Sequence, residues 1–246
     1  MSENSKPTLP ILAAILAFLV AGCASPSRPP SRPSLVAVRL PDGGTSDFKS
    51  WEHVAKHPFM ELGDYILRNP VQIAFAWDDD ALYFHFEAQD DDIFNEAPDS
   101  ITSGVFLWGD CIELFLQPEG ERGYLEFHFT PAGFSGAIFF PSRGRRMPWD
   151  VKYIPMEGLS STLEISGTLN DMSDTDAAWR GICRIPWNAI RQRFPNYEPG
   201  EPLRVQSTSI AYSIHSDGDE KSQLHHVPGS WADPHHLPNW SPLAFE

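Results

Sequence analysis

Hydrophobic and polar residues alternate along two neighbouring segments near the middle of the chain, residues 111–116 and 124–129. Successive side chains of a β-strand point to opposite faces, so strict alternation predicts strands with one apolar and one polar face. The apolar face would carry Ile112, Leu114, Leu116, Leu125, Phe127 and Phe129. The polar face would carry Glu113, Tyr124, Glu126 and His128. We therefore expect one face of this strand pair to be core and the other to be a candidate binding surface.

Short alternating segments of the same kind continue along most of the chain, separated by turn residues such as Asp78-Asp79-Asp80. They span residues 35–40, 71–77, 81–88, 136–140, 151–154, 163–169, 179–185 and 203–214. A helix is predicted only over residues 187–194, which begin after Pro186 and end before Pro195. The pattern predicts an all-β fold, an antiparallel β-sandwich of the immunoglobulin or jelly-roll kind with one short helix.

The N-terminal residues carry targeting signals. Lys6 precedes an uncharged apolar run over residues 11–20, which is typical of an export signal and too short for a transmembrane helix. The sequence Leu19-Val20-Ala21-Gly22-Cys23 resembles the lipobox of bacterial lipoproteins, which implies lipid modification at Cys23. Ala24 after it favours the outer membrane by the same resemblance. We predict a signal peptide at 1–22, a lipidated cysteine with a Pro/Ser tether at 23–34 and one β-domain at 35–246. The predicted location is that of an exported lipoprotein, at the outer membrane, the cell surface or the periplasm.

The composition narrows the classes of partner. A formal net charge of −15 argues against nucleic acid, whose phosphates would repel the protein, and against a polybasic membrane patch. Hydrophobic residues at 41% and aromatic residues at 12% are enough for the core of one large domain. Cys111 falls on the face of Glu113, whereas Cys183 falls on an apolar face. A disulfide between Cys111 and Cys183 is therefore not expected.

The polar strand face beside Trp108 has the chemistry of a sugar-binding surface. An aromatic ring packs against the C–H face of a sugar, and polar side chains bond its hydroxyl groups. By the same alternation, Tyr83 and His85 fall on the polar face of their strand, as Glu113 does on its strand, which makes them further candidates. The alternatives are a solvated edge charge at Glu113 and a packing role for Trp108.

An ordered set of motifs resembles the family 9 carbohydrate-binding modules. The set comprises Trp51, residues 71–78, 82–90, 109–116 and 124–127, and Ile185-Pro186-Trp187. The resemblance implies a β-sandwich that grips a sugar between two tryptophans, here Trp108 and Trp231, with Glu113 as the acid of the site. The basic group of the family falls at His128, where an imidazole that titrates near neutrality replaces a permanent guanidinium charge. The resemblance also implies that a separate glycoside hydrolase could be a partner, in polysaccharide or oligosaccharide catabolism.

Metal-ligating residues occur in acidic loops and histidine pairs. The family often holds calcium, and Asp90, Asp92 and Asp110 offer oxygen ligands for a structural Ca²⁺, although acidic runs commonly remain solvated. For the pairs His225-His226 and His235-His236 we favour solvated loop positions over a transition-metal site, because no metal motif accompanies them.

These observations favour non-catalytic carbohydrate binding over two alternatives. A glycoside hydrolase would use two carboxylates, for which Glu113 and Glu126 on the polar face are the candidates. No serine-nucleophile or phosphate-loop motif is found, and a shallow face lacks the enclosed site that a raised-pKa acid needs. A haem-binding or purely structural sandwich is the second alternative.

Overall fold

The structure is a computed structural model that describes residues 34–41, 47–59, 69–98, 104–143, 152–211, 223–226 and 234–246. All of them belong to the unit that spans Arg32–Glu246. Within these ranges, no helix has the length and apolarity needed to cross a membrane.

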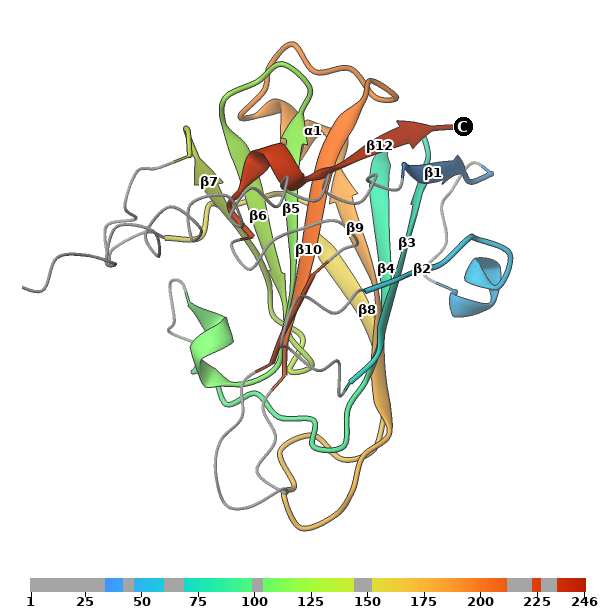
Figure 1. Cartoon of the computed structure of the whole chain (residues 1–246), viewed down its shortest axis with the longest axis vertical. Coiled ribbons are helices and arrows are strands. Elements are labelled where there is room, and N and C mark those ends of the chain that lie inside the picture. The colour runs from blue at the N-terminus through green and yellow to red at the C-terminus, as the bar shows by residue number, and fades with distance from the viewer. Residues whose placement is uncertain are drawn as a thin grey trace, which may run out of the picture. The chain divides into compact units, whose positions relative to one another are not determined.

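The strands form one continuous sheet, which curls so that its two halves face each other as a β-sandwich (Figure 1). The order is β7 (Ser135–Phe140), β6 (Tyr124–Phe129), β5 (Cys111–Pro118), β10 (Leu203–Ala211), β12 (Ser241–Phe245), β1 (Leu35–Arg39), β3 (Val71–Trp77), β4 (Ala81–Gln89), β9 (Ala178–Pro186) and β8 (Ser160–Ser166). Two shorter strands lie off this path, with β11 (Gln223–His226) paired to β10 and β2 (His57–Pro58) paired to β3. The pairings are antiparallel except at β1, which runs parallel to both β12 and β3.

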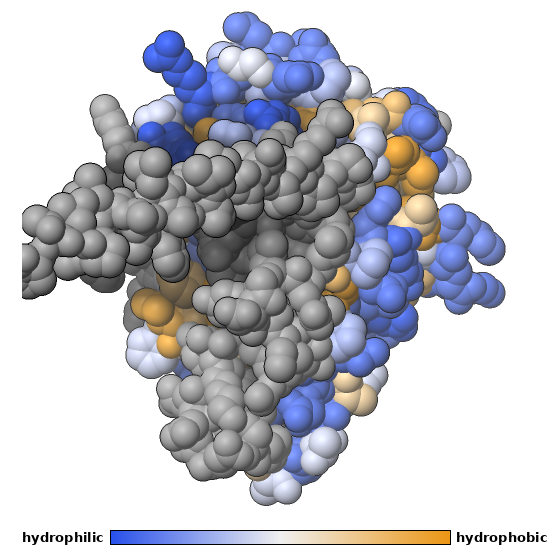
Figure 2. All heavy atoms as spheres, in the orientation of Figure 1, coloured by the Kyte–Doolittle hydropathy of each residue, from blue (hydrophilic) through white to orange (hydrophobic). Residues whose placement is uncertain are grey.

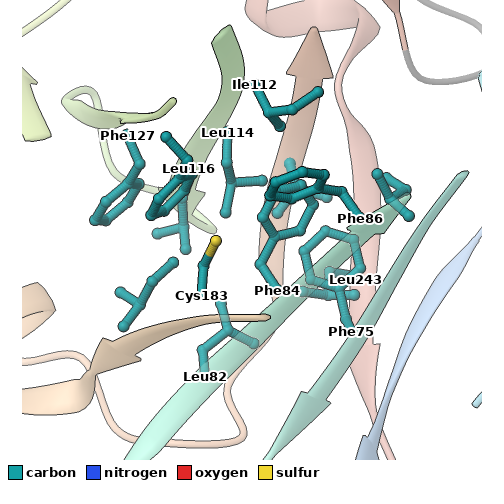
Figure 3. Packing of buried hydrophobic residues seen from close by; sticks show 14 of the residues in the cluster. Phe75, Leu82, Phe84, Phe86, Ile112, Leu114, Leu116, Phe127, Cys183 and Leu243 are labelled. Atoms are coloured by element: carbon teal, nitrogen blue, oxygen red, sulfur yellow. The ribbon is translucent and has the colours of Figure 1, made fainter. Parts of the chain in front are cut away.

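The central core lies between two halves of the sheet, one that contains β5 and β6 and one that contains β3 and β4. Leucine, isoleucine and phenylalanine side chains of β5 and β6 pack against those of β3 and β4, as Figure 3 shows. The side chains predicted for the apolar face of residues 111–116 and 124–129 are all buried in this core. Burial of each such side chain contributes about 1.5 to 3 kcal/mol to folding. Cys183 lies in the same core, whereas Cys111 lies on the other face of β5, and both are free thiols.

Short segments cover the outer face of each half. The 3₁₀-helix η1 (Phe48–Trp51) packs on β3 and β4 in a cluster that includes Ala74 and Tyr83. On the other half, Trp240 follows the 3₁₀-helix η3 (Leu237–Asn239) and packs with Phe115, Tyr124 and Phe140. The polar face of β5 and β6 is therefore enclosed, and not the shallow, solvent-exposed surface that alternation alone suggested.

Several elements differ from the sequence prediction. The predicted strand at 151–154 is a single bridge between Ala137 and Ile154, and the helix α1 ends early, at Trp187–Arg191, with turns before Pro195. Proline disfavours helical backbone in the residue before it, which shortens the helix. Strand β12 gave a weak signal because it contains Pro242, which lacks a backbone donor.

Candidate functional site

The polar face of β5 and β6 brings Glu113, Glu126 and His128 together. Glu113 and His128 are cross-strand partners in the β5–β6 register, and Glu126 lies two positions before His128 on the same face of β6. His128 Nε2 lies 2.7 Å from Glu126 Oε1 and 3.2 Å from Glu113 Oε1. All three residues are buried, with exposed fractions of 5%, 5% and 0%. We call these three residues the carboxylate–histidine cluster.

A third strand holds the carboxylate of Glu113. Thr208 of β10 pairs with Glu113 in register, and its hydroxyl donates to Glu113 Oε2. The neighbouring Ser207 hydroxyl donates to the Glu113 backbone carbonyl at 2.6 Å. Glu113 is thus oriented from both sides, by His128 from β6 and by Thr208 from β10.

Tyr153 fixes the orientation of the His128 ring. Its hydroxyl lies 2.6 Å from His128 Nδ1, which leaves Nε2 directed at the carboxylates. Gly136, the β7 partner of His128, makes room for this arrangement, because a Cβ at that position would meet the Tyr153 ring at 2.8 Å. The edge of Phe106 also packs on the imidazole, with ring centroids 5.7 Å apart.

The pKa values of His128 and Glu113 shift in opposite directions. Burial alone would lower the pKa of His128, but hydrogen bonds with Glu113 and Glu126 raise it well above its usual value. Burial alone would raise the pKa of Glu113, but the bond and charge of His128 and the bond from Thr208 hold it below its usual value. His128 is therefore an imidazolium at neutral pH, which differs from the expectation that it titrates there. The two neighbouring carboxylates are the reason.

Glu126 retains an unused oxygen. Its Oε2 atom is buried and has no hydrogen-bond partner in the described part of the chain. His235 Nε2 lies 3.9 Å away, and His235 Nδ1 is bonded to the Tyr124 hydroxyl at 2.7 Å. His235 also packs against Phe115 from its turn, with 38% of its side chain exposed, so this loop residue borders the site.

Trp108 ends the 3₁₀-helix η2 (Val105–Trp108), whose Phe106 packs against His128 of the cluster. Its side chain is 44% exposed, and the preceding Leu107 is 65% exposed. The first two residues of η2 contact the site. Val105 N–H donates to the Tyr153 hydroxyl, and Phe106 packs on His128. Figure 2 shows that hydrophilic residues dominate the described part of the viewed face, with orange hydrophobic patches among them. The large hydrophobic side chains that are exposed among the described residues are Leu107, Trp108 and Met172, so two of the three lie side by side on η2, as suits a ligand.

The glycine after Trp108 sets the course of the chain. Gly109 has a φ of 138° and lies against the backbone of Phe94 and Asn95, where a Cβ would come within 2.3 Å of the Phe94 carbonyl oxygen. A side chain at this position would push η2 away from the strand that follows. Gly109 therefore fixes where Trp108 stands relative to β5.

The other predicted site residues lie elsewhere or outside the described residues. Tyr83 and His85 are on β4, in the other half of the sheet order, and the structure does not bring them to Glu113. Tyr83 donates to Asp78 at 2.8 Å, and His85 stacks on Trp51 with ring centroids 5.1 Å apart. Trp231 and Cys23 lie outside the described residues.

The calcium candidates are only partly assembled. Asp90 is buried beside Asp92, and burial together with the neighbouring acidic groups raises the pKa of Asp90 to about 7. Asp110 Oδ2 accepts the Phe94 backbone N–H at 2.7 Å, which is a structural use. Asp90 Oδ1 accepts the Asp92 backbone N–H at 3.2 Å, and these two carboxylates remain the candidate calcium ligands.

Sequence reasoning missed Thr208, Tyr153 and His235. Thr208 lies in a polar run, Gln206-Ser207-Thr208-Ser209, inside an otherwise apolar strand, and that run was a usable signal. Tyr153 lies in the run 151–154, which we predicted as a strand but which forms a single bridge, and its alternation did not mark Tyr153 as a site residue. His235 lies in a turn, where no periodicity marks the direction of a side chain.

Comparison with known proteins gives structural likeness without sequence likeness. No family profile matches the sequence, and a search of curated proteins finds no significant match. A crystal structure from Bacteroides uniformis, of a protein to which carbohydrate binding is provisionally assigned, superposes with a TM-score of 0.65 at 16% identity, over 88% of this chain and 100% of that one.

Two further structures come from Caldicellulosiruptor kristjanssonii and are family 9 carbohydrate-binding modules. The complex with cellotriose has a TM-score of 0.54 at 14% identity, over 87% of this chain and 94% of that one. The complex with glucose has a TM-score of 0.53 at 13% identity, over 87% of this chain and 96% of that one. The chain described above thus has the β-sandwich fold of these proteins.

Proposed function

We propose that residues 35–246 form a non-catalytic carbohydrate-binding module whose ligand lies beside Trp108 and the carboxylate–histidine cluster. One observation supports this most: an exposed tryptophan ends the short helix η2 that packs on the buried, oriented carboxylate–histidine cluster, in a fold whose solved examples hold glucose and cellotriose. The ring would take the C–H face of a sugar, and the carboxylates would take its hydroxyl groups.

The proposed roles follow from the geometry of each group. Glu126 Oε2 has unused accepting capacity, so it is the atom best placed to receive a sugar hydroxyl. His128 bonds both carboxylates through Nε2 and so holds them in place, and its charge keeps the pKa of Glu113 below its usual value. Trp231 remains the second aromatic platform by the family resemblance alone.

A glycan array of the purified protein tests this proposal. We expect binding to at least one glucose-containing oligosaccharide, weakened about tenfold in Trp108→Ala, which is a loss of about 1.4 kcal/mol. Leu107→Ala, which shortens the other exposed side chain of η2, is the matched control and should bind as the parent does. An array with no bound glycan would contradict the proposal.

The hydrolase alternative fits the geometry poorly. A glycosidase needs its two carboxyl groups on either side of the scissile bond, whereas Glu113 and Glu126 both point at His128 Nε2. Release of reducing ends from a polysaccharide, lost in Glu113→Gln, would favour the hydrolase instead. A visible absorption band of the purified protein would favour the haem alternative.

Calcium and the lipid anchor complete the proposal. We expect Ca²⁺ at Asp90 and Asp92 to act structurally, so that EDTA lowers the melting temperature and CaCl₂ restores it in the parent but not in Asp90→Asn.

We expect Cys23 to carry lipid, so that radiolabelled palmitate enters the parent but not Cys23→Ala. A separate glycoside hydrolase is the partner that such a tethered module would serve.

A further inference from the structure

We propose that Glu113, Glu126 and His128 bind a divalent transition-metal ion, with Zn²⁺ as the best match. This inference concerns the same three side chains but goes beyond carbohydrate binding, because it needs no sugar. Zinc would replace the proton that His128 Nε2 shares with the two carboxylates, and that proton would be released to solvent. Within the described ranges, they are the one group of three histidine, cysteine or acidic side chains whose ligand atoms converge, all within 4.8 Å of one another.

The distances between the donor atoms suit an ion in their midst. Zinc takes imidazole nitrogen and carboxylate oxygen ligands at about 2.0 to 2.2 Å, which places tetrahedral ligands roughly 3.3 Å from one another. Nε2 of His128 lies 2.7 and 3.2 Å from the two carboxylate oxygens. To admit the ion, His128 Nε2 would need to move about 0.6 Å further from the Glu126 oxygen and about 0.1 Å further from the Glu113 oxygen.

The surrounding contacts are those of an oriented metal site. A ligating histidine commonly bonds a second group through its other ring nitrogen, and His128 Nδ1 does so with Tyr153. A ligating carboxylate is commonly held by a further hydrogen bond, and Thr208 supplies one to Glu113. Both ligands are thus fixed in place from outside the cluster.

A second, independent observation points to a missing cation. Glu126 is 5% exposed, yet its Oε2 atom has no hydrogen-bond partner among the described residues. A buried carboxylate oxygen without a partner is costly, and a metal ion would satisfy it. The ring nitrogen of His235 that faces this oxygen, at 3.9 Å, offers a fourth donor on the same side.

The donor set selects the class of ion. Two carboxylates with one or two imidazoles suit zinc and its transition-metal neighbours. Calcium prefers six to eight oxygen ligands and is disfavoured by the imidazole nitrogen. This cluster is therefore distinct from the calcium proposed at Asp90 and Asp92.

Calorimetric titration of the full-length purified protein with ZnCl₂ tests the site, after treatment with EDTA and reloading with CaCl₂, with no sugar present. We expect one high-affinity equivalent of zinc per chain in the parent, and at least tenfold weaker binding in Glu126→Gln, which keeps the shape of the side chain. Glu87→Gln, which alters a carboxylate of the other half of the sandwich, should bind zinc as the parent does. Circular dichroism would confirm that each variant is folded.

A measurement on the parent alone guards against variants that fail to fold. Co²⁺ in place of zinc should give the intense visible absorption of a four-coordinate site, and added zinc should abolish it. Absence of a stoichiometric zinc site, or equal zinc affinity in Glu126→Gln, would overturn the inference. Because no sugar takes part, this failure would leave the carbohydrate proposal standing, and the converse also holds.

Discussion

His85 and His128 are both buried histidines on the outer faces of the sandwich, but their surroundings differ. His85 of β4 lies under η1, stacked on Trp51 at an interplanar angle of 18°, with Phe48 at its edge. His128 of β6 lies between two carboxylates. Burial lowers the pKa of His85 to about 4, whereas the carboxylates raise that of His128 well above its usual value. One half of the molecule therefore encloses a neutral ring, and the other encloses a charged one.

The difference shows which half is suited to a ligand. An aromatic cover completes the outer face of β3 and β4 as an additional small core, where a neutral imidazole behaves as one more flat ring. The carboxylate–histidine cluster instead keeps charges out of water, which is costly unless they are closely paired. Maintaining such a group against η2, which carries the exposed Trp108, is reasonable where binding needs it, and this supports the assignment of the site to β5 and β6.

Replacing His128 should produce the largest effect. His128→Leu would leave Glu113 and Glu126 buried without a cation, which should lower the free energy of unfolding by about 3 to 5 kcal/mol. Urea denaturation measures this. Adding Glu113→Gln and Glu126→Gln to His128→Leu should recover part of the loss. A single variant as stable as the parent would show that the cluster is not ionised.

Acid should remove the contribution of His85. The folded-state pKa of His85, about 4, lies below the ordinary 6.5, so its contribution to stability is present above pH 6.5 and is lost as the pH falls towards 4. His128 has the opposite sign, because its contribution is present below 6.5 and is lost only as the pH rises through its raised pKa.

The parent should therefore lose about 2 kcal/mol more than His85→Phe between about pH 7 and pH 4.5. Groups common to both proteins cancel in this difference, which urea denaturation at each pH would measure. Equal losses in the two proteins would mean that His85 is not held neutral.

At neutral pH, His85→Phe should cost little. A phenyl ring has nearly the shape of imidazole and can stack on Trp51 in the same way, so we expect a change below about 1.5 kcal/mol in the free energy of unfolding. Urea denaturation of the two variants, His85→Phe and His128→Leu, gives the direct contrast between the halves. A loss at His85 as large as that at His128 would remove the distinction.

The smallest effect on stability is expected at Trp108. Because its side chain is half exposed, Trp108→Ala should change the melting temperature little while it weakens sugar binding. A thermal melt beside a binding isotherm separates the two. A large loss of stability with unchanged binding would instead assign Trp108 to packing.

The faces of individual strands could be predicted from the sequence, but the assembly of the strands could not. Alternation placed Glu113, Glu126 and His128 on one face, since side chains repeat every two residues in a strand. Thr208 reaches Glu113 across 95 positions of sequence, and strand order is not written in any local pattern. For the same reason, alternation grouped His85 with Glu113, although β4 and β5 lie in different halves of the sheet order.

The central claim is that the charged half of the sandwich binds carbohydrate, and a calorimetric titration tests it most directly. The parent and Glu126→Gln would each be titrated with the tightest-binding oligosaccharide from the array, with His85→Phe as the control from the neutral half. We predict that His85→Phe binds as the parent does and that Glu126→Gln binds at least tenfold more weakly. Equal affinity in all three proteins would contradict the account.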